Sequence, residues 1–482
     1  MEALKNFIGG KWISAQAADT IMDVNPADTR EIIAHVPQST AADAQAAIEA
    51  AEEAFPAWKQ VPAPQRGQFL FKVADQLEAK QEEFARLISQ EMGKTLADAK
   101  KEVTYAANIF RFYAGEGTRL NGTLVASDSP SIQIQLVPEP LGVVLVITPW
   151  NFPLSIPAWK IAPALVAGNT VVLKPSSDTP VVATKLLEVL QECGVPDGVV
   201  NLIIGPGRLV SGMIHHPAVK AVTFTGSTHV GRLIYAEASK DMKPALLEMG
   251  GKNPLLVLDD ADLDEAAELA VRGAFGQTGQ ACTATSRVIV QSAVLSEFTS
   301  KLIEKTKQFK VGHPFAEGVD IGPQANAGEL ESTLDAVRKA IADGATILAG
   351  GDVPQSPDTQ NGYYVNPTML GNVTRQMSIA KEEVFGPVLC VMEASSVDDA
   401  ISIANDVEYG LSSAVCTKDL SRMAKCSREI EAGVVKINMT TTGTSFQAPF
   451  GGFKSSSSGI NKELGKEAVD FYCRYKTIYV KS

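Results

Sequence analysis

One cysteine of the chain lies in surroundings that suit a nucleophile. Cys282 is part of the stretch GQTGQACTATSR, among glycine and small hydroxyl side chains. Of the six cysteines, only Cys282 has this glycine-bearing, loop-like context. An inert buried thiol is the alternative, because free cysteine is among the residue types most often found in protein cores. As a nucleophile, Cys282 would need help to ionise, from a helix N-terminus or a neighbouring positive charge.

Two polar residues in apolar surroundings are candidates for proton transfer and for oxyanion binding. Glu248 ends an apolar run in LEMGGKNP, where burial would raise the pKa of the carboxyl group toward that of a general base. Asn151 lies between Trp150 and Phe152, and its amide could donate a hydrogen bond to a developing oxyanion. A solvated glutamate at a turn and an asparagine bound to its own backbone are the alternatives.

A glycine-bearing turn could bind a phosphate group. In FTGSTHVGR a predicted strand ends at Phe224 and a helix begins after Gly226. Gly226 and Gly231 allow close approach of the backbone, and Ser227 or Thr228 could cap the helix or bind phosphate at its positive end. The stretch departs from the G-x-G-x-x-G pattern, so a plain glycine turn remains the alternative.

The elements that must position these residues form two α/β series. Residues 41–58 and 66–92 have apolar side chains at helical spacing, and short β-rich runs alternate with helices from residue 141 onward. A second series of the same kind follows Gly251. This alternation predicts an α/β fold with two parallel sheets and crossover helices. Residues 129–140 and 471–482 are predicted to form exposed strands that another subunit would cover.

Composition excludes several classes of partner. The 482 residues carry 55 Asp and Glu against 43 Lys and Arg, a formal net charge of -12, which disfavours nucleic acid and acidic membrane surfaces. The most apolar stretch, residues 141–159, contains three prolines and is not expected to span a membrane. The first residues lack the pattern of a signal peptide. Scattered cysteines without clustered histidines predict a reduced, cytoplasmic protein with no metal site.

Together these stretches resemble the aldehyde dehydrogenase superfamily over nearly the whole chain. The motifs that carry the resemblance are residues 149–153 (PWNFP), 174–175 (KP), 224–228 (FTGST) with Gly231, 247–252 (LEMGGK), 279–282 (GQAC), 383–387 (EVFGP) and 449–452 (PFGG). The implied fold has two Rossmann-type parallel-sheet domains plus a small β oligomerisation arm. It would comprise a cofactor-binding domain (1–120 and 141–249), a catalytic domain (250–450) and the arm (121–140 and 464–482). The arm implies a homodimer or homotetramer.

The resemblance implies roles for the three candidate residues. Cys282 would be the nucleophile, Asn151 the oxyanion donor and Glu248 the base. The implied steps are attack of the thiolate on the aldehyde carbon, hydride transfer from the thiohemiacetal to a nicotinamide, and hydrolysis of the thioester, with no metal. Because members that acylate coenzyme A generally lack the base, the presence of Glu248 favours a free acid as product.

A nicotinamide cofactor site is implied in the same way. Lys174 would bind the adenosine ribose, Ser227 the pyrophosphate and Glu383 the nicotinamide ribose. The other residues expected at the cofactor are Trp150, Ser177, Gly226, Gly231 and Phe385. NAD-preferring relatives commonly carry a glutamate three residues after the lysine, where Ser177 leaves room for a 2′-phosphate. We therefore expect use of NADP with some use of NAD, although the charge of the adjacent Asp178 opposes this preference.

Within the superfamily the chain looks most like the α-ketoglutarate semialdehyde (2,5-dioxopentanoate) dehydrogenases, on IPAWKIAPAL, GQACTATSR and APFGGFKSSSSG. Succinate semialdehyde dehydrogenases use arginines to hold the substrate carboxylate where Trp159 and Gly276 stand, and neither of these residues can pair with an anion. Simple transfer of that substrate therefore fails, and succinate semialdehyde is kept only as an alternative, as are other aliphatic or aromatic aldehydes. The residues expected to line the substrate site are Phe152, Trp159, Thr283 and Phe446. A cysteine esterase or hydrolase is the alternative from another class, but it would need a histidine, and none lies near Cys282 in the sequence.

Overall fold

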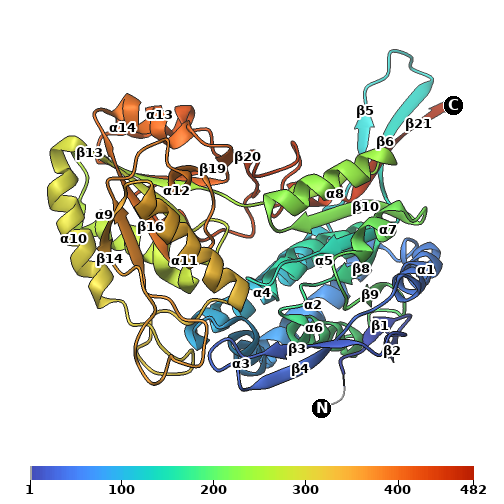
Figure 1. The fold of residues 1–482 in the computed structure, drawn as a ribbon. Coiled ribbons are helices and arrows are strands. Elements are labelled where there is room, and N and C mark those ends of the chain that lie inside the picture. Colours follow the sequence, from blue (N-terminus) through green and yellow to red (C-terminus); the bar gives the residue numbers. More distant parts are fainter. Residues whose placement is uncertain (1–2, 482) are drawn as a thin grey trace.

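The computed structural model describes residues 3–481. These residues form two seven-stranded sheets, and a small three-stranded sheet projects from the first of them (Figure 1). Each large sheet has buried apolar residues on both faces, so that helices cover it on both sides. The expected α/β fold class with two parallel-sheet domains is confirmed.

The first sheet contains five parallel strands in the order β11-β10-β7-β8-β9, extended by the antiparallel strands β1 and β2. Along the sheet the strands are β11 (Ala245–Glu248), β10 (Val219–Thr225), β7 (Val143–Ile147), β8 (Thr170–Lys174), β9 (Val200–Leu202), β1 (Asn6–Ile8) and β2 (Lys11–Ile13). From β7 the chain passes to β8 and β9 on one side and later to β10 on the other. The strand order thus reverses between β7 and β10, and ligands commonly bind beyond the carboxyl ends of strands at such a point.

The helices around this sheet are α1 (Ala41–Trp58), α2 (Ala63–Ala79), α3 (Gln81–Met92), α4 (Leu96–Glu116), α5 (Ser155–Ala167), α6 (Pro180–Glu192), α7 (Leu209–His215) and α8 (Thr228–Lys240). Local sequence explains where several of them begin. Thr40 and Asp43 form a capping box at the start of α1, and the Ser227 side chain caps α8. All residues of α5 are buried, because it packs between the sheet and α4.

The second sheet has the order β14-β15-β16-β13-β12-β18-β19, and only β14 is antiparallel to its neighbour. Its strands are β14 (Thr346–Ala349), β15 (Thr368–Gly371), β16 (Val388–Ala394), β13 (Thr285–Gln291), β12 (Asn253–Val257), β18 (Ser412–Cys416) and β19 (Val434–Ile437). Its helices are α9 (Leu263–Phe275), α10 (Leu295–Gln308), α11 (Ala327–Ala342), α12 (Ser378–Lys381), α13 (Val397–Asn405) and α14 (Leu420–Glu429).

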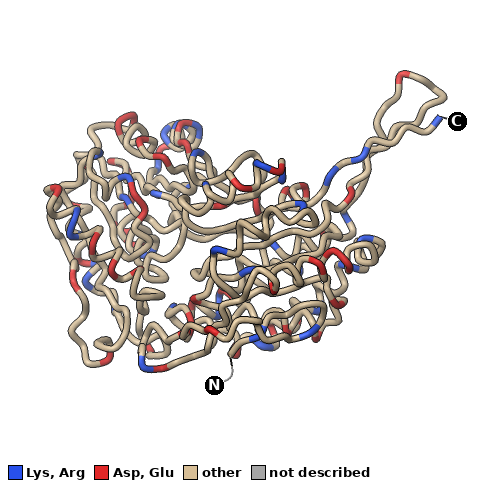
Figure 2. The backbone as a smooth tube through the Cα atoms, turned by 45° about the vertical axis from the view of Figure 1, so that its right-hand side comes forward, with Lys and Arg blue, Asp and Glu red and all other residues tan. Residues whose placement is uncertain are grey.

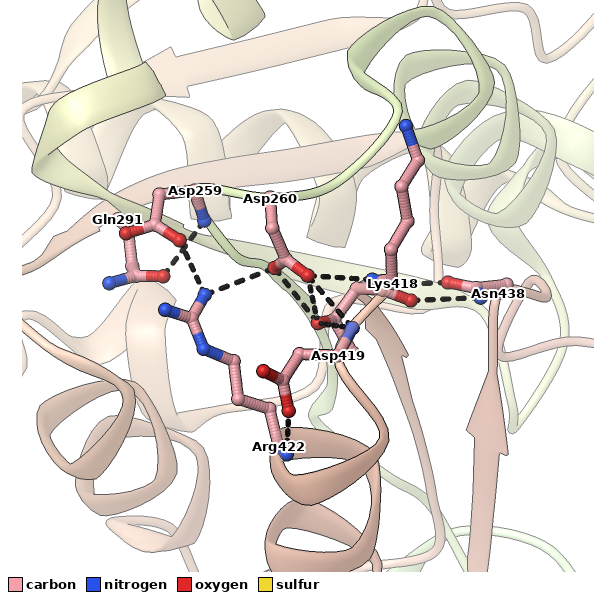
Figure 3. A network of polar contacts seen from close by, with 8 residues as sticks. Asp259, Asp260, Gln291, Lys418, Asp419, Arg422 and Asn438 are labelled. Carbon is pink, nitrogen blue, oxygen red and sulfur yellow. Dashed lines mark hydrogen bonds and ion pairs between the residues drawn. The ribbon is translucent and has the colours of Figure 1, made fainter.

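A polar network joins the carboxyl ends of β12 and β18 to the start of α14 (Figure 3). Asp260 accepts hydrogen bonds from the Thr417 hydroxyl (2.8 Å) and from the backbone N–H groups of Lys418 (2.7 Å) and Asp419 (2.9 Å). Arg422 completes the network by pairing with Asp259 and Asp260. Strand order reverses between β12 and β18, and ligands commonly bind beyond the carboxyl ends of strands at such a point. In this sheet the Asp260 carboxylate occupies that place.

The projecting sheet consists of β5 (Thr123–Val125), β6 (Ile132–Pro140) and β21 (Cys473–Lys481), all antiparallel. The two segments expected to be exposed strands therefore pair with each other, and Figure 1 shows them extending away from the first sheet. The remaining elements are the pairs β3 (Thr20–Val24) with β4 (Ile32–Pro37) and β17 (Tyr409–Gly410) with β20 (Phe453–Lys454), the short helix α15 (Glu467–Phe471), and the 3₁₀ turns Gly276–Gly279 and Ser292–Val294.

Charged residues of both signs are distributed over the fold. Figure 2 shows Lys and Arg interspersed with Asp and Glu along the chain. Within residues 3–481, no helix is both long and apolar enough to cross a membrane.

Candidate active site

Cys282 lies between a strained turn and the start of β13. Gln277, Thr278 and Gly279 all have left-handed backbone angles, with φ of 53°, 59° and 67°. Thr278 donates from its hydroxyl to the carbonyl of Gly322 (3.0 Å), and a Cβ at Gly279 would overlap the carbonyl oxygen of Gly386. Consecutive left-handed residues outside glycine are costly, and such strain gathers at functional sites. The turn presents Cys282 at one end of the second sheet.

The surroundings of Cys282 keep its side chain a thiol. Burial, followed by the nearby carboxylates of Glu383 and Glu248, raises the pKa of the Cys282 thiol to about 12. The backbone N–H groups of Thr283 and Cys282 act in the opposite direction, because they donate hydrogen bonds to the sulfur. The Cys282 carbonyl in turn accepts from the Asn253 side chain at 2.8 Å, which fixes the main chain behind the sulfur.

A cavity of about 780 Å³ extends from Cys282 to the ends of β10 and β11. Its inner walls include Phe152, Trp159, Thr283, Glu248 and Thr225. Charged side chains of both signs also line it, namely Asp98, Lys101, Glu102, Glu268, Arg272, Lys305 and Asp320. The cavity therefore brings the expected nucleophile, the expected base and three of the four expected substrate residues together.

Glu248 is the last residue of β11 and is 2% exposed. Thr225 pairs with it at the end of β10, so both residues lie at the carboxyl edge of the first sheet. Burial, and then the charge of Glu463, raise the pKa of the Glu248 carboxyl well above its usual value, while a hydrogen bond from Ser457 (3.0 Å) opposes this rise. Its second oxygen has no hydrogen-bond partner. A buried carboxyl group of raised pKa facing a cavity can exchange a proton with a water molecule there.

Asn151 lies in the turn between β7 and α5 and is 3% exposed. Its side-chain amide donates to the carbonyl of Gln280 at 3.0 Å, two residues before Cys282. Asn151 itself is not among the residues that line the cavity, although its neighbour Phe152 is. The amide is thus held beside the segment that carries the sulfur, at the edge of the cavity.

Two buried charged residues beside Glu248 were missed by the sequence analysis. Lys160 on α5 forms an ion pair with Glu463 and donates to the Thr223 hydroxyl at 2.9 Å. Their side chains are 0% and 2% exposed, and the main chain of Glu463 bridges Phe450. A lysine inside the apolar stretch IPAWKIAPAL was a signal, because a buried ammonium group needs a buried partner.

The residues expected at the cofactor gather at the carboxyl edge of the first sheet and across from it. Lys174 ends β8 next to Ile147 of β7, and Gly226, Ser227 and Gly231 form the β10–α8 turn. Trp150 packs edge-on against Phe385 at 5.4 Å between ring centroids. Ser177, half-buried, follows β8 in the loop before α6.

The chemistry of these residues fits a nicotinamide dinucleotide. Burial lowers the pKa of the Lys174 ammonium to about 8, and the ammonium group donates a hydrogen bond to the carbonyl of Pro175. The buried hydroxyls of Thr148 and Thr225, at this edge of the sheet, have no hydrogen-bond partner. Glu383 accepts from the Gly251 N–H at 2.9 Å, and burial raises the pKa of its carboxyl group to about 7. A buried cation and unpartnered hydroxyls are what a polar, anionic ligand would satisfy.

Of the expected substrate residues, Phe446 lies apart from the other three. Its ring packs against Tyr105 and Phe112, with centroids 6.1 Å and 5.8 Å away, and it does not line the cavity. Tyr105 takes the position nearer the cavity instead and is bound to the Thr444 hydroxyl at 2.7 Å. We expected Phe446 in the site because it is close to the PFGG motif in the sequence. In the structure, Tyr105 of α4 packs against Phe446 and lines the cavity in its place. Among residues 3–481, no group of three His, Cys, Asp or Glu side chains is arranged to hold a metal ion.

Residues 12–478 match the model of the aldehyde dehydrogenase family. The chain belongs to this family. It is 46% identical over 477 residues to alpha-ketoglutaric semialdehyde dehydrogenase of Bacillus subtilis strain 168, covering 99% of this chain and 98% of that protein. The resemblance to such dehydrogenases seen in the sequence is therefore confirmed.

Solved structures of this family share the fold. A betaine aldehyde dehydrogenase from Staphylococcus aureus in complex with NAD+ superposes with a TM-score of 0.97 at 36% identity, over 99% of this chain and 95% of that one. An NADP-dependent enzyme from E. coli superposes with a TM-score of 0.96 at 35% identity, over 100% and 98%. The chain is thus an aldehyde dehydrogenase in sequence and in fold.

Proposed function

We propose that this aldehyde dehydrogenase oxidises a small aliphatic semialdehyde, α-ketoglutarate semialdehyde, to the free acid with NADP, or less effectively NAD, as the oxidant. The observation that carries the proposal is the cavity of about 780 Å³ lined by both the Cys282 thiol and the Glu248 carboxyl group. The 46% identity to the Bacillus subtilis alpha-ketoglutaric semialdehyde dehydrogenase supports the choice of substrate.

In the first step the Cys282 thiol gives its proton to a water molecule in the cavity, and the resulting thiolate sulfur forms a bond with the aldehyde carbon. The carbonyl oxygen becomes an oxyanion, and the amide of Asn151 and the backbone N–H of Cys282 donate hydrogen bonds to it. Support for this role of Asn151 comes from its bond to the Gln280 carbonyl, which holds the amide beside the segment that carries Cys282. Removing one such donor typically slows turnover about 10²–10³-fold.

The remaining steps are oxidation of the carbon bound to Cys282 and hydrolysis, which releases the acid. When bound, a nicotinamide cofactor would supply a positive charge that favours ionisation of the sulfur, and it would accept a hydride, so that the former aldehyde carbon loses its hydrogen with two electrons and becomes the carbon of a thioester on Cys282. Glu248 then takes a proton from a water molecule, the water oxygen bonds to the thioester carbon, and the carbon–sulfur bond breaks to return the Cys282 thiolate. The raised pKa of Glu248 and its place in the cavity support its role as this base.

Selection of NADP is attributed to the loop after β8. Ser177 carries no charge that would repel a 2′-phosphate. The neighbouring Asp178 accepts a hydrogen bond from the Ser176 hydroxyl at 2.8 Å and one from the Asn326 side chain at 3.4 Å. These bonds engage both oxygens of Asp178, which supports the view that its charge is directed away from the 2′ position.

A homodimer or homotetramer is part of the proposal. Several large apolar side chains of the projecting sheet are exposed, namely Leu124, Val125, Tyr475, Tyr479 and Val480. Exposed strand edges with apolar side chains invite pairing with another chain. Light scattering at micromolar concentration tests this expectation, and a monomer would contradict it.

A panel of semialdehydes assayed with NAD and NADP separately, following the reduced cofactor, tests the function. We expect the highest kcat/KM for α-ketoglutarate semialdehyde with NADP, and no turnover for Cys282→Ala. Equal or better use of succinate semialdehyde would transfer the substrate assignment to it. Ester hydrolysis without any aldehyde oxidation would favour a cysteine hydrolase, although no histidine is among the residues that line the described cavity.

A further inference from the structure

A buried ion pair lies behind the turn that carries Asn151. Lys94 lies between α3 and α4, and Glu102 is on α4. The Lys94 Nζ is 2.6 Å from Glu102 Oε2, and the two side chains are 0% and 1% exposed. Neither residue belongs to the motifs identified in the sequence, and neither has a role in the mechanism proposed above.

Lys94 holds the first part of the turn. Its ammonium group donates to the main-chain carbonyl of Asn151 at 2.9 Å. The same group lies 4.2 Å from the centre of the Phe152 ring, a distance at which a desolvated cation is attracted to the face of an aromatic ring. One cation thus fixes two consecutive residues of the turn.

Glu102 holds the last part of the turn. Its Oε1 accepts hydrogen bonds from the backbone N–H groups of Leu154 (3.0 Å) and Ser155 (3.1 Å). Helix α5 begins at Ser155, and its N-cap residue Leu154 has no side chain that can accept such bonds. Glu102 therefore supplies, from another helix, the acceptor and the negative charge that a helix N-terminus favours.

Burial of the Lys94–Glu102 ion pair costs desolvation free energy, so its presence calls for a reason other than stability. Burying two charges is expensive, and a buried ion pair often stabilises a fold no better than apolar residues of the same volume. Here, however, both charged groups also bind the main chain of the turn, Lys94 at Asn151 and Glu102 at Leu154 and Ser155, so that together they fix residues 151–155 at both ends. On its other side, the Asn151 amide is bound to Gln280. The main chain of Asn151 is thus set by Lys94, and its side chain reaches toward the segment of Cys282.

We propose that Lys94 and Glu102 are positioning residues, which set the place of the Asn151 amide relative to the Cys282 sulfur. This inference rests on the oxyanion role proposed above for Asn151. Oxyanion donors must be held to within about 0.5 Å of their productive positions, so a turn released at its main-chain anchor would lose transition-state stabilisation more than substrate binding.

A double-mutant cycle between Lys94→Met and Asn151→Ala tests the proposal. The full-length protein is assayed with NADP and α-ketoglutarate semialdehyde, or the best aldehyde of the panel, and kcat is referred to the titrated Cys282 thiol. Lys94→Met should lower kcat about 10- to 100-fold, as expected when a reacting geometry is displaced, with little change in KM. In the Asn151→Ala background the same substitution should change kcat less than about threefold, because the group it positions is absent.

A matched control separates positioning from folding. Arg66, a buried cation in the same half of the molecule, donates to the Val166 carbonyl (2.9 Å) at the opposite end of α5. Arg66→Met should lower the unfolding midpoint but leave kcat per titrated thiol unchanged. If Lys94→Met yields too little folded protein, Glu102→Gln enters the same cycle, since it keeps the volume and an acceptor oxygen.

The outcomes are distinct. An equal fold-loss for Lys94→Met or Glu102→Gln in both backgrounds, or unchanged kcat in the wild-type background, overturns the positioning role. Full activity of Asn151→Ala alone overturns the proposed oxyanion role instead, whatever the effect at Lys94. Loss of kcat in the wild-type background that disappears without the Asn151 amide supports the proposal.

Discussion

Glu248 and Ser457 are joined twice: their main chains form an antiparallel bridge, and the Ser457 hydroxyl donates to Glu248 Oε1 at 3.0 Å. The C-terminal segment thereby reaches across to the end of β11 and contacts the proposed base directly. Glu463, six residues further along, lies close enough for its charge to raise the pKa of Glu248. One segment thus brings two influences of opposite sign to the same carboxyl group.

Ser457→Ala should move the rising limb of kcat against pH to higher pH. Burial and Glu463 raise the pKa of Glu248, and the Ser457 hydrogen bond lowers it by favouring the ionised form. Glu248 works as a base only when ionised, so activity rises with pH as its proton is lost. Without the hydroxyl, that loss occurs at higher pH. A pH profile that stays in place would show that Glu248 ionisation does not limit turnover.

Glu463→Gln should move the same limb to lower pH, because the charge that raises the pKa of Glu248 is removed. The substitution also leaves Lys160 buried without its anion. Removing one partner of a buried ion pair typically costs about 3–5 kcal/mol, so the free energy of unfolding should fall by that amount. Both effects are measured on one variant, by the pH profile of kcat and by denaturant titration. A shift in the same direction as that of Ser457→Ala would refute the electrostatic account.

Alkylation of Cys282 in the cofactor-free protein should accelerate up to strongly alkaline pH. Only the thiolate reacts with iodoacetamide, and the pKa of this thiol is about 12 because of its burial and the two nearby carboxylates. The rate should therefore rise about tenfold per pH unit from pH 7 to 10 without levelling. Cys282→Ser serves as the control for labelling elsewhere. A plateau near pH 8 would mean that Cys282 ionises far more readily than its surroundings indicate.

Much of the fold was predictable because its signals are local. Apolar runs such as VVLVI between turn residues predict buried parallel strands, and β7 has that sequence. Of Ser227 and Thr228, either of which was expected to cap a helix or bind phosphate, Ser227 caps α8. The cavity also brings together Cys282 and Glu248, which are 34 positions apart in the sequence. Cys282 lies three residues before β13, and Glu248 is the last residue of β11.

The groups that surround these residues were not predictable, because their partners are remote in sequence. Lys160 and Glu463 are 303 positions apart, and Lys94 contacts Asn151 across 57. No local pattern pairs such residues; only the packing of α4, α5 and the C-terminal segment does. Phe446 shows that closeness in sequence can also mislead. It was expected in the substrate site because it is near the PFGG motif, but Tyr105 lines the cavity instead.

Asp260→Asn should destabilise the second sheet near neutral pH. Burial alone would raise the pKa of Asp260, but hydrogen bonds from Thr417, Lys418 and Asp419 bring it below its usual value of 3.8. A carboxyl group whose pKa is lowered by folding stabilises the protein above the pKa of its unfolded form and loses this effect as the pH falls. Hydrogen bonds to a charged group contribute about 1.5–3 kcal/mol, so the variant should lose about that much at pH 7. The difference from wild type should shrink below about pH 4; a constant difference would refute the ionic origin.

Ser177→Glu should convert the preference for NADP into one for NAD. The loop from Lys174 to Asp178 follows β8 at the carboxyl edge of the first sheet, and Asp178 is engaged by Ser176 and Asn326. A glutamate at position 177 would add a charge that repels a 2′-phosphate and could accept hydrogen bonds from two ribose hydroxyls. Two like charges about 4 Å apart near a protein surface repel by about 4 kcal/mol, which screening and side-chain movement reduce. A fall of at least tenfold in the ratio of kcat/KM with NADP to that with NAD is therefore expected.

Ser177→Gln, of the same length but uncharged, is the matched control. If the glutamine variant lowers the ratio as much as the glutamate variant does, bulk rather than charge selects the cofactor at this position.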